Sequence, residues 1–414
     1  MAFVINIDIP PSGTMYLPLE GTVNVTVNWG DGTVILYNSA GVFHHQYGSN
    51  RFYEITIGTN NGDILTHFGS NDPSWVTSIQ YITSVDFSQS NTLNLTSLSY
   101  AFAGPGNFTI SSLPSSVNDL SFMFYNNTTF NQDISSWNVS NVTNMNSMFM
   151  NATQFNKDIG SWTVNSVTNM YHMFQNAPNF NQNLNNWNVS NVTNMQGMFA
   201  NTTGNFNGNI SSWDTSKVTL MGSMFYGSIN FNQDISNWNL SNVTITNTMF
   251  YNCTNFNQNI SRWNVSKVTD MGGMFDNCIN FNQDISSWNV SNVTTMYGMF
   301  SGAINFNSNL NNWNVGKVTN MKDMFRNCTN FNCDLNNWNV SNVTTMEGMF
   351  KNTLVSNFNG NISNWNVSKV NNMWSMFEGT NFFNQDISNW NVSNVTTMTA
   401  MFAFLYNFNA DISK

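Results

Sequence analysis

The stretch FNQDISSWNVSNVTNMNSMFMNATQ, residues 130–154, is followed at Phe155 by a second version of the same phrase. The phrase recurs every 25 residues, apart from one insertion of a single residue and one of two residues. A period of this length is typical of repeat proteins, in which one copy cannot bury enough apolar surface but stacked copies can. The copies begin at Phe130, Phe155, Phe180, Phe206, Phe231, Phe256, Phe281, Phe306, Phe331, Phe358 and Phe383, and a truncated copy begins at Phe408.

Two apolar patterns lie within each copy. Around Trp137 and Val139, apolar and polar residues alternate, which favours a short strand with these two side chains facing inward. Met145, Met148 and Phe149 follow at the i, i+3, i+4 spacing of an amphipathic helix. We therefore predict a repeat solenoid with one short strand and one short helix in each 25-residue copy, and with Phe, Trp and Met in one continuous interior.

The composition restricts the class of partner. Of the 414 residues, 41% are hydrophobic and only 8% are charged, and the formal net charge is −10. Nucleic acids and anionic membrane surfaces attract basic proteins, so neither is expected as a partner. No apolar stretch reaches the roughly 18 residues that a membrane helix needs, so we expect no membrane insertion. The opening MAFVINIDIPPSGTMYLPLEG lacks the basic and apolar regions of a secretory signal peptide.

The residues before the repeats follow a different pattern. VNVTVNWGDGTVILY, residues 23–37, and FYEITIGT, residues 52–59, alternate like strands around turn-rich segments, which predicts a small β-sandwich over residues 1–75. NWGDGT, residues 28–33, followed by HQY, residues 45–47, resembles the polycystic-kidney-disease (PKD) type of immunoglobulin-like module. In that family such residues shape a turn and the core, and the resemblance implies no catalysis.

The repeats themselves carry a second resemblance. The Phe-Asn start, the Trp, the Asn-Val-Thr-x-Met and the Met-Phe of each copy are similar to the BspA-like, or DUF285, family, also described as a bacterial surface protein 26-residue repeat. The resemblance implies a leucine-rich-repeat-like solenoid over residues 130–414 that acts in adhesion and interaction. NFTISSLPSSVNDLSFMF, residues 107–124, resembles the shorter BspA-type repeat, so residues 76–129 are predicted to form an N-terminal cap of irregular repeats.

The outward strand positions would form a broad polar face. The residue after the repeat Trp is Asn in most copies, and aromatic side chains are absent from this column. Such a face would bind a protein or a glycan through many small contacts, or would simply be solvated; the sequence leaves both interpretations open. The candidate binding residues are Asn138, Asn188, Asn239, Asn264, Asn289, Asn314 and Asn339.

Other polar columns have structural interpretations. Thr143 and its equivalents are expected to cap the predicted helix, with an ice-binding Thr ladder as the alternative. Asn131 and its equivalents are expected to bond the turns of neighbouring copies. A Lys recurs in alternate late copies, and an Asp or Asn precedes the repeat Ile. Both are interpreted as solvated, without a calcium site.

Catalytic and redox patterns are weak. Cys253 and Cys278 share one repeat position and are expected to be small buried thiols, with a disulfide between them as the alternative. His172 is the one histidine within the repeats. No nucleophile–base order, phosphate-binding loop or metal-ligand spacing occurs. We therefore expect no enzymatic activity, no cofactor and no metal.

The absence of catalytic patterns predicts a non-enzymatic protein. The resemblance implies an interaction or adhesion role at a cell surface or a virion surface, with a protein or glycan as partner. The alternative is a structural assembly subunit of an oligomer, a filament or a giant-virus particle. The last copy stops where its strand should begin, whereas solenoid ends need a polar cap. Self-association would then use Phe408, Asp411 and Ile412.

Overall fold

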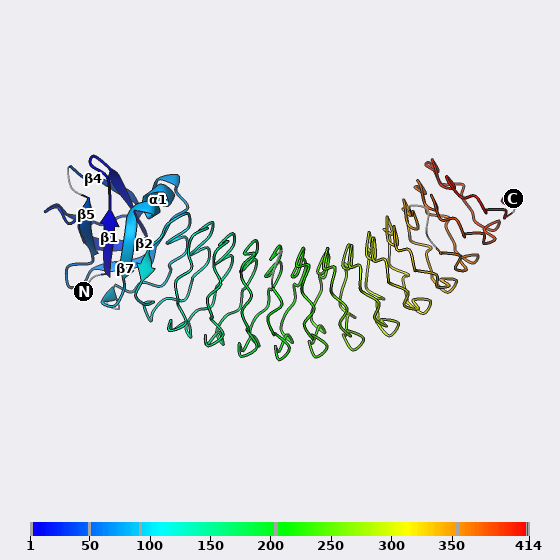
Figure 1. The fold of residues 1–414 in the computed structure, drawn as a ribbon, viewed down its shortest axis with the longest axis horizontal. Coiled ribbons are helices and arrows are strands. Elements are labelled where there is room, and N and C mark those ends of the chain that lie inside the picture. The colour runs from blue at the N-terminus through cyan, green and yellow to red at the C-terminus, as the bar shows by residue number, and fades with distance from the viewer. Residues whose placement is uncertain are drawn as a thin grey trace. The chain divides into compact units, whose positions relative to one another are not determined.

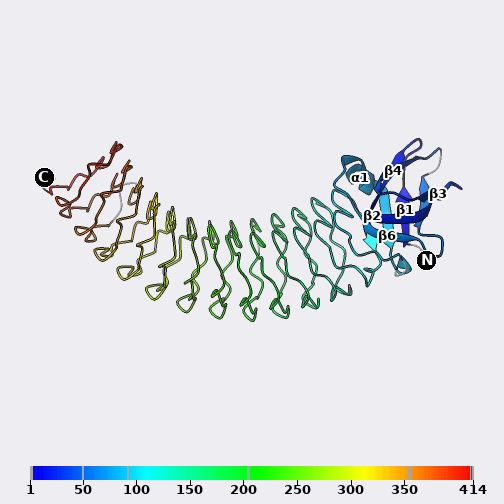
Figure 2. The same ribbon diagram turned by 180° about the vertical axis from the view of Figure 1, so that it is seen from behind.

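The computed structural model describes residues 3–48, 51–90, 93–202, 206–352, 357–410 and 412. The chain forms two compact units, Met1–Val192 (unit 1) and Thr193–Lys414 (unit 2). In Figures 1 and 2 the labelled strands and helix lie at the blue end of the chain, and similar loops, each one copy, follow one another in the rest of each unit. We call each of these loops a rung.

Unit 1 begins with a strand-rich region. Its elements are β1 (Phe3–Asp8), β2 (Thr14–Asn28), β3 (Val34–Tyr37), β4 (Gly41–Gln46), β5 (Phe52–Ile57), β6 (Ile64–Phe68), α1 (Pro73–Ser78), the short 3-10 helix η1 (Ile79–Tyr81), β7 (Ile82–Asp86) and β8 (Thr109–Ile110). The long strand β2 pairs with β4 and β6 as well as with β3 and β5, and the main strand order is β3-β2-β5-β1-β7-β8. Among the named strands of the described residues, β7 and β8 form the one parallel pair.

The turn motif of the N-terminal region packs as its sequence suggests. The Tyr47 hydroxyl donates to the backbone carbonyl of Trp29 over 2.8 Å. The His45 ring stacks on the Trp29 indole with 5.0 Å between ring centres, and its Nε2 lies 2.7 Å from Oδ2 of Asp31. The NWGDGT and HQY motifs therefore contact each other, and together they link a buried aromatic cluster to a turn at the surface.

Parallel bridges connect the strand region of unit 1 to its rungs. His67 of β6 bridges to Ser97, Ser97 to Asp119, Asp119 to Asn144, and Asn144 to Asn169. Each rung after the first thus uses one residue to bridge to the rung before it. In unit 2 the corresponding bridges join, in order, Asn194, Leu220, Ile245, Asp270, Thr295, Asn320, Thr345, Asn372 and Thr397.

The predicted helix is wrong, because within the described ranges no rung contains one. The N–H of Met148 donates to the carbonyl of Met145 (3.3 Å), whereas the N–H of Phe149 donates to Met173 in the next rung (2.9 Å). Since alternate N–H groups bond to the neighbouring rung, the i→i−4 bonds of a helix cannot form. Ser147 has φ 52°, a left-handed conformation that a right-handed helix excludes. The segment is a series of overlapping turns.

The predicted strand is also wrong, although the side chains point as expected. The N–H of Trp137 donates to Ile134 (3.1 Å) and that of Val142 to Val139 (2.9 Å), so this part of the rung is built from turns. Trp137 and Val139 are buried while Asn138 between them is exposed. The alternation of apolar and polar residues therefore correctly predicted which side chains face inward. The β-bridge between rungs, however, forms at another position in the copy.

The repeat tryptophans lie inside each unit, as predicted. The side chain of Trp263 is 3% exposed, and its Nε1 donates to the carbonyl of Ile235 in the preceding rung over 3.0 Å. Its ring stacks on Trp288 with 6.3 Å between centres. A buried indole N–H without an acceptor would destabilise the folded state. This bond gives the N–H its acceptor and also sets the register between neighbouring rungs.

Candidate functional site

The predicted asparagine face forms an exposed column in each unit. The Oδ1 atom of each of these side chains is hydrogen-bonded within its own rung. Oδ1 of Asn264 accepts the N–H of Ser266 (3.1 Å), and Oδ1 of Asn289 accepts that of Ser291 (3.2 Å). Such bonds close Asx turns. Asn138, Asn188, Asn239, Asn314 and Asn339 make the same bond. Within the described residues their Nδ2 groups donate to no acceptor, so the column presents donors.

Two further columns hold the rungs together. The N–H of Asn257 donates to Oδ1 of Asn232 over 3.0 Å, which confirms the predicted amide column. Thr269 donates through its N–H and its hydroxyl to the carbonyl of Thr244 (2.9 and 3.2 Å). The predicted helix cap is therefore wrong, because this Thr bonds the preceding rung and no helix follows. Its hydroxyl hydrogen is already bonded, which disfavours the ice-binding alternative.

One face of unit 2 changes its chemistry from rung to rung. We define the turn face as the residues sixteen and twenty positions after each repeat Phe, on the overlapping turns. The turn face is not among the predicted binding residues, although its two columns differ from copy to copy in the sequence. In unit 2 its larger members are Tyr226, Asn247, Tyr251, Asp276, Tyr297, Ser301, Lys322, Arg326, Glu347, Lys351, Trp374 and Glu378.

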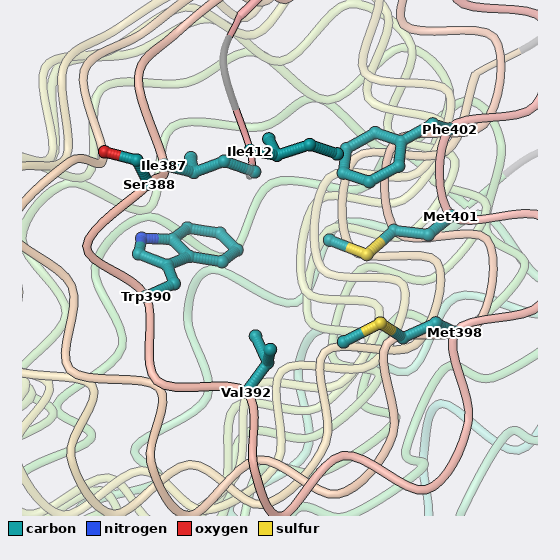
Figure 3. Close-up of a pocket in the computed structure, with 8 residues that line it drawn as sticks. All are labelled: Ile387, Ser388, Trp390, Val392, Met398, Met401, Phe402 and Ile412. Carbon is teal, nitrogen blue, oxygen red and sulfur yellow. The ribbon is translucent and has the colours of Figure 1, made fainter. Parts of the chain in front are cut away.

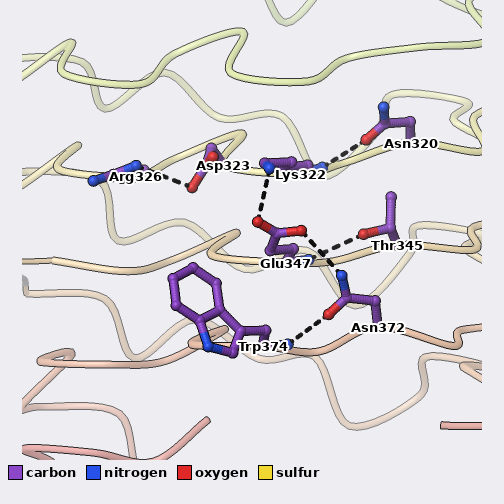
Figure 4. Close-up of polar contacts among 8 residues, drawn as sticks. All are labelled: Asn320, Lys322, Asp323, Arg326, Thr345, Glu347, Asn372 and Trp374. Carbon is purple, nitrogen blue, oxygen red and sulfur yellow. Dashed lines mark hydrogen bonds and ion pairs between the residues drawn. The ribbon is translucent and has the colours of Figure 1, made fainter. Parts of the chain in front are cut away.

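Charged and aromatic side chains contact one another across the late rungs of the turn face (Figure 4). Nζ of Lys322 lies 2.7 Å from Oε1 of Glu347, whose Oε2 accepts Nδ2 of Asn372 over 3.0 Å. Nζ of Lys351 lies 4.9 Å from the ring centre of Trp374, within range of a cation–π interaction. These contacts cross from one rung to the next and hold Trp374 at the surface.

Two carboxyl groups on these turns are partly withdrawn from water. Burial raises the pKa of Asp276 to about 6, against the opposing effect of a hydrogen bond from Ser301. Burial also raises the pKa of Asp323, although the positive charge of Arg326, 3.7 Å from its Oδ1, opposes the rise. The charge of this part of the turn face therefore changes near pH 6, where Asp276 titrates.

Neighbouring rungs of unit 2 are closer together on the Met-Phe side than on the Trp side. The ring centres of Phe250 and Phe275 are 5.6 Å apart, whereas those of Trp263 and Trp288 are 6.3 Å apart. The turn face flanks the Met-Phe side in the sequence of each rung. It therefore lies on the inner side of the bend within unit 2.

The last rung of unit 2 leaves apolar side chains uncovered around a hollow of about 170 Å³ (Figure 3). Trp390 is 7% exposed, but Met398 and Val392 are 40% and 39% exposed and Ile412 is 50% exposed. The other lining residues are Ile387, Ser388, Met401 and Phe402. Equivalent side chains in internal rungs, such as Met373, are fully buried because the next rung covers them.

Of the predicted assembly residues, Ile412 lines this hollow and Phe408 packs against one of its lining residues. Phe408 stacks on Phe383 and Phe402, with 6.0 and 4.8 Å between ring centres, while Asp411 lies outside the described residues. The N–H of Met373 donates to Thr397 in the next rung (2.8 Å). Among the described residues the equivalent N–H of Met398 has no acceptor.

The cysteines of the repeats are structural. Cys253 and Cys278 are free and buried, so the alternative disulfide is not formed. Each Sγ donates to a backbone carbonyl over 2.8 Å, that of Phe225 and that of Phe250 respectively. Burial raises the pKa of both thiols above their ordinary range, which makes them poor nucleophiles. The expectation of buried thiols is confirmed.

Chemically reactive side chains are scattered across the described ranges. No three His, Cys, Asp or Glu side chains there gather closely enough to hold a metal ion. His172 stacks on Tyr171 at 3.7 Å, and burial lowers the pKa of its imidazole. Of the helices within the same ranges, none combines the length and the apolar character needed to cross a membrane.

Comparison with known families identifies the repeats. The profile of the family described as "Mycoplasma protein of unknown function, DUF285" matches residues 96–205, 183–278, 259–357 and 353–414, well over half of the chain. The chain belongs to the DUF285 family. No curated protein and no solved structure matches it significantly. In this DUF285 protein the matched region begins beside Ser97, the residue that bridges to β6.

The constant and the varying columns of the DUF285 rungs have different places in the structure. Constant residues, such as Trp263 and Thr269, bond or stack on neighbouring rungs. Varying residues, such as Tyr297 and Trp374, are exposed on the turn face. The candidate asparagines share one column, with Asn138 and Asn188 in unit 1 and the other five in unit 2.

Proposed function

We propose that this DUF285 protein is a non-enzymatic interaction protein that binds a partner protein through the turn face of unit 2. One observation supports the proposal above the others: the turn face varies in chemistry from rung to rung, while constant columns such as those of Trp263 and Thr269 are bonded between rungs and the constant asparagine face is uniform. Selecting one partner requires a particular arrangement of attractive and repulsive groups, which a uniform column cannot supply.

The turn face carries the residue types that dominate binding energy in protein interfaces. Tyr, Trp and Arg are enriched at such hot spots. Tyr297 and Trp374 are exposed, and the Arg326 side chain is 45% exposed. Tyr226 and Tyr251 stack at 4.6 Å and extend the aromatic surface. The ion pairs beside them add little stability because they are partly exposed, but they would give specificity.

The finer architecture forms part of the same proposal. We interpret residues 130–414 as a leucine-rich-repeat-like solenoid whose rungs are built from turns, and residues 76–129 as its cap. We interpret residues 1–75 as a PKD-like β-sandwich. A cell-surface or virion-surface location is proposed from family-level analogy, which supports access to a partner but does not identify one.

Binding of the full chain to arrays of extracellular proteins and of glycans tests the proposal. The turn-face variant combines Tyr297→Ser, Arg326→Ser and Trp374→Ser. We expect its affinity for protein ligands to fall by at least about tenfold, because hot-spot side chains contribute more than 1 kcal/mol each.

A matched variant changes the asparagine face instead. It combines Asn264→Ser, Asn289→Ser and Asn314→Ser, in which the Ser hydroxyl still offers an oxygen to the turn. We expect protein binding to be retained. Loss of binding in this variant alone, or ligands confined to the glycan array, would contradict the turn-face proposal.

Self-assembly through the last rung is a second candidate function, supported by the exposure of Val392, Met398 and Ile412. Exposed apolar side chains and free N–H groups at an edge favour pairing with another chain. Light scattering across protein concentration would show an oligomer, and Met398→Ser combined with Val392→Ser would convert it to monomer. A monomer at all concentrations would exclude this candidate.

A further inference from the structure

A column of alternating Lys and Asn runs along unit 2, eleven residues after the repeat Phe. Its members are Lys217, Asn242, Lys267, Asn292, Lys317, Asn342, Lys369 and Asn394. A lysine therefore stands on every second rung. The turn face does not include this column, and all four of its lysines precede the last rung. It concentrates positive charge in a chain that has 11 basic residues and a net charge of −10.

Hydrogen bonds hold the ammonium groups of this column in place. Nδ2 of Asn292 donates to the carbonyl of Ser266 in the preceding rung (2.7 Å), and its Oδ1 accepts Nζ of Lys317 in the next (2.6 Å). Lys267 and Lys369 bond in the same way to Asn242 and Asn342 (2.6 and 2.7 Å). Each asparagine therefore positions the lysine that follows it.

Three of the four lysines of this column lie beside no carboxylate in the described part of the chain, whereas Lys217 interacts electrostatically with the carboxylate of Asp214. Within the described residues, Lys267, Lys317 and Lys369 are exposed and form no ion pair. By contrast, Lys322 and Lys351 on the turn face lie 2.7 and 2.8 Å from carboxylate oxygens. The column therefore offers ordered cations that the fold has not neutralised locally.

The residues three positions before these lysines add further donors. Asn264 and Asn314 close Asx turns through Oδ1, which leaves their exposed Nδ2 groups facing solvent without an acceptor in the described part of the chain. Asn366, before Lys369, does the same. On the rungs of Lys267, Lys317 and Lys369 an ammonium group and an amide donor thus lie close together in sequence, whereas Asp214 stands at this position before Lys217. A ligand rich in acceptors complements the face of these three lysine rungs.

We infer that this row binds a linear acidic polysaccharide whose carboxylate or sulfate groups recur once per disaccharide. Near this column the N–H of Thr319 bonds to the carbonyl of Thr294 in the preceding rung over 2.9 Å, and the ring centres of Trp263 and Trp288 are 6.3 Å apart. Backbones bonded in this way lie about 4.8 Å apart, so lysines on alternate rungs are roughly 10–13 Å apart. A disaccharide in an extended chain has about this length. Each anionic group would accept charge-assisted bonds from one ammonium group and a nearby Nδ2.

Nucleic acid fits the same row poorly. Duplex DNA places a phosphate about every 3.4 Å along each strand, so lysines on alternate rungs would meet only about one phosphate in three and leave the others without a cation. Proteins that bind single strands stack the bases on aromatic side chains. The Lys–Asn column and the residues three positions before it in unit 2 contain no aromatic residue.

Titration of the full chain with fluorescent heparin and hyaluronan oligosaccharides at several salt concentrations tests the inference. The variant Lys267→Gln, Lys317→Gln and Lys369→Gln should bind at least about tenfold more weakly, and its log–log salt slope should fall by about three. Hyaluronan carries only carboxylates, whereas heparin carries sulfates as well as carboxylates, so the two are compared at equal total charge. Tighter binding of heparin under that condition would indicate that sulfate is bound, and equal or tighter binding of hyaluronan would indicate carboxylate; either supports the row.

Two controls separate this site from general charge attraction. Lys322→Gln, Arg326→Gln and Lys351→Gln remove the same charge from the turn face and should change affinity by less than about twofold. Lys267→Asn with Asn292→Lys keeps the net charge but breaks the two-rung interval, and should weaken binding. Circular-dichroism melting would confirm that each variant folds.

Four results would overturn the inference. They are equal losses in the two triple variants, unchanged affinity in the variant with the shifted lysine, tighter binding of a single-stranded DNA of equal charge, and no binding of either polysaccharide at about 50 mM salt, where surface attraction is strong. None of these results bears on the turn-face proposal, which rests on different residues and a protein ligand.

Discussion

Trp238 donates its indole N–H to the backbone carbonyl of Ile210, in the preceding rung, over 3.2 Å. Trp263 and Trp288 make the same bond to their own preceding rungs (3.0 and 3.1 Å). One side chain thus fills the interior and fixes the position of a rung on its neighbour. Stability in such a protein is a sum of rung and interface contributions, so the interior can be tested rung by rung.

Trp238→Ala should lower the free energy of unfolding by about 3–5 kcal/mol, because it leaves a cavity and an unsatisfied carbonyl. The rungs on either side should then unfold in two steps, visible by calorimetry and hydrogen exchange. As a control, Phe382→Ala should cost less than about 0.5 kcal/mol, since Phe382 is 56% exposed. A single transition at an unchanged temperature in Trp238→Ala would refute the prediction.

Asn264→Ala should destabilise the folded state by about 1 kcal/mol, because the N–H of Ser266 loses its acceptor. Asn264→Asp should cost much less, since a carboxylate oxygen replaces the amide oxygen in the turn. Urea unfolding of both variants measures the difference. Equal losses in the two variants would show that the Asx turn is not the source of the effect.

Asp276 should make stability fall as pH rises. Its pKa is raised from 3.8 to about 6 in the folded state, so between these values the unfolded chain loses a proton that the folded protein keeps. The unfavourable contribution of Asp276 to the free energy of unfolding is absent below this pH range and constant above it. Asp276→Asn should therefore stabilise the protein at neutral pH and have little effect near pH 3.

Asp284 provides the opposite case, and thermal unfolding at several pH values measures the stability of both the Asp276 and the Asp284 variants. Hydrogen bonds from the backbone and hydroxyl of Ser286 lower the pKa of its carboxyl group. The stabilisation is present above the ordinary pKa of Asp and is lost as pH falls. Asp284→Asn should thus weaken the protein at neutral pH. A loss of stability at neutral pH in Asp276→Asn as well would contradict the proposed desolvation of Asp276.

Cys333 should react with iodoacetamide before the other thiols. It is half-buried, whereas Cys253, Cys278 and Cys328 are buried. Alkylation of a folded protein requires access as well as thiolate. Mass spectrometry of the native protein should show one early modification, which Cys333→Ser removes. Rapid modification of Cys253 or Cys278 without unfolding would be inconsistent with the buried column.

The helix prediction was wrong because overlapping turns bury the same apolar spacing that a helix would bury. The spacing of Met145, Met148 and Phe149 places three side chains on one side of a helix, but overlapping turns place the same side chains inward. Ser147 and Asn151 have φ values of 52° and 62°. Recurrent Gly, Asn and Ser at these two columns, including Gly298 with φ 55°, were a signal for left-handed backbone that hydrophobic spacing does not contain.

The candidate site was also predicted only in part. Asn264 and Asn289 are exposed, as alternation with the buried Trp required, but the sequence did not show that their oxygens close turns. The turn face went unnoticed, because it was assigned to a helix and its columns do not repeat. Contacts such as that of Lys351 with Trp374 join residues on adjacent rungs, and they arise only when the rungs stack.

Side-chain polarity and the 25-residue period were enough to establish a stacked repeat protein with Trp, Met and Phe inside, because burial follows from the free energy of transferring each side chain out of water. The hydrogen-bond partners of the backbone N–H and C=O groups could not be predicted from side-chain polarity and period. Whether the N–H of Phe149 bonds within its own rung or to the next depends on how closely the rungs approach. That choice, made by the packing of whole rungs, replaced helices with turns and brought the varying residues to the surface.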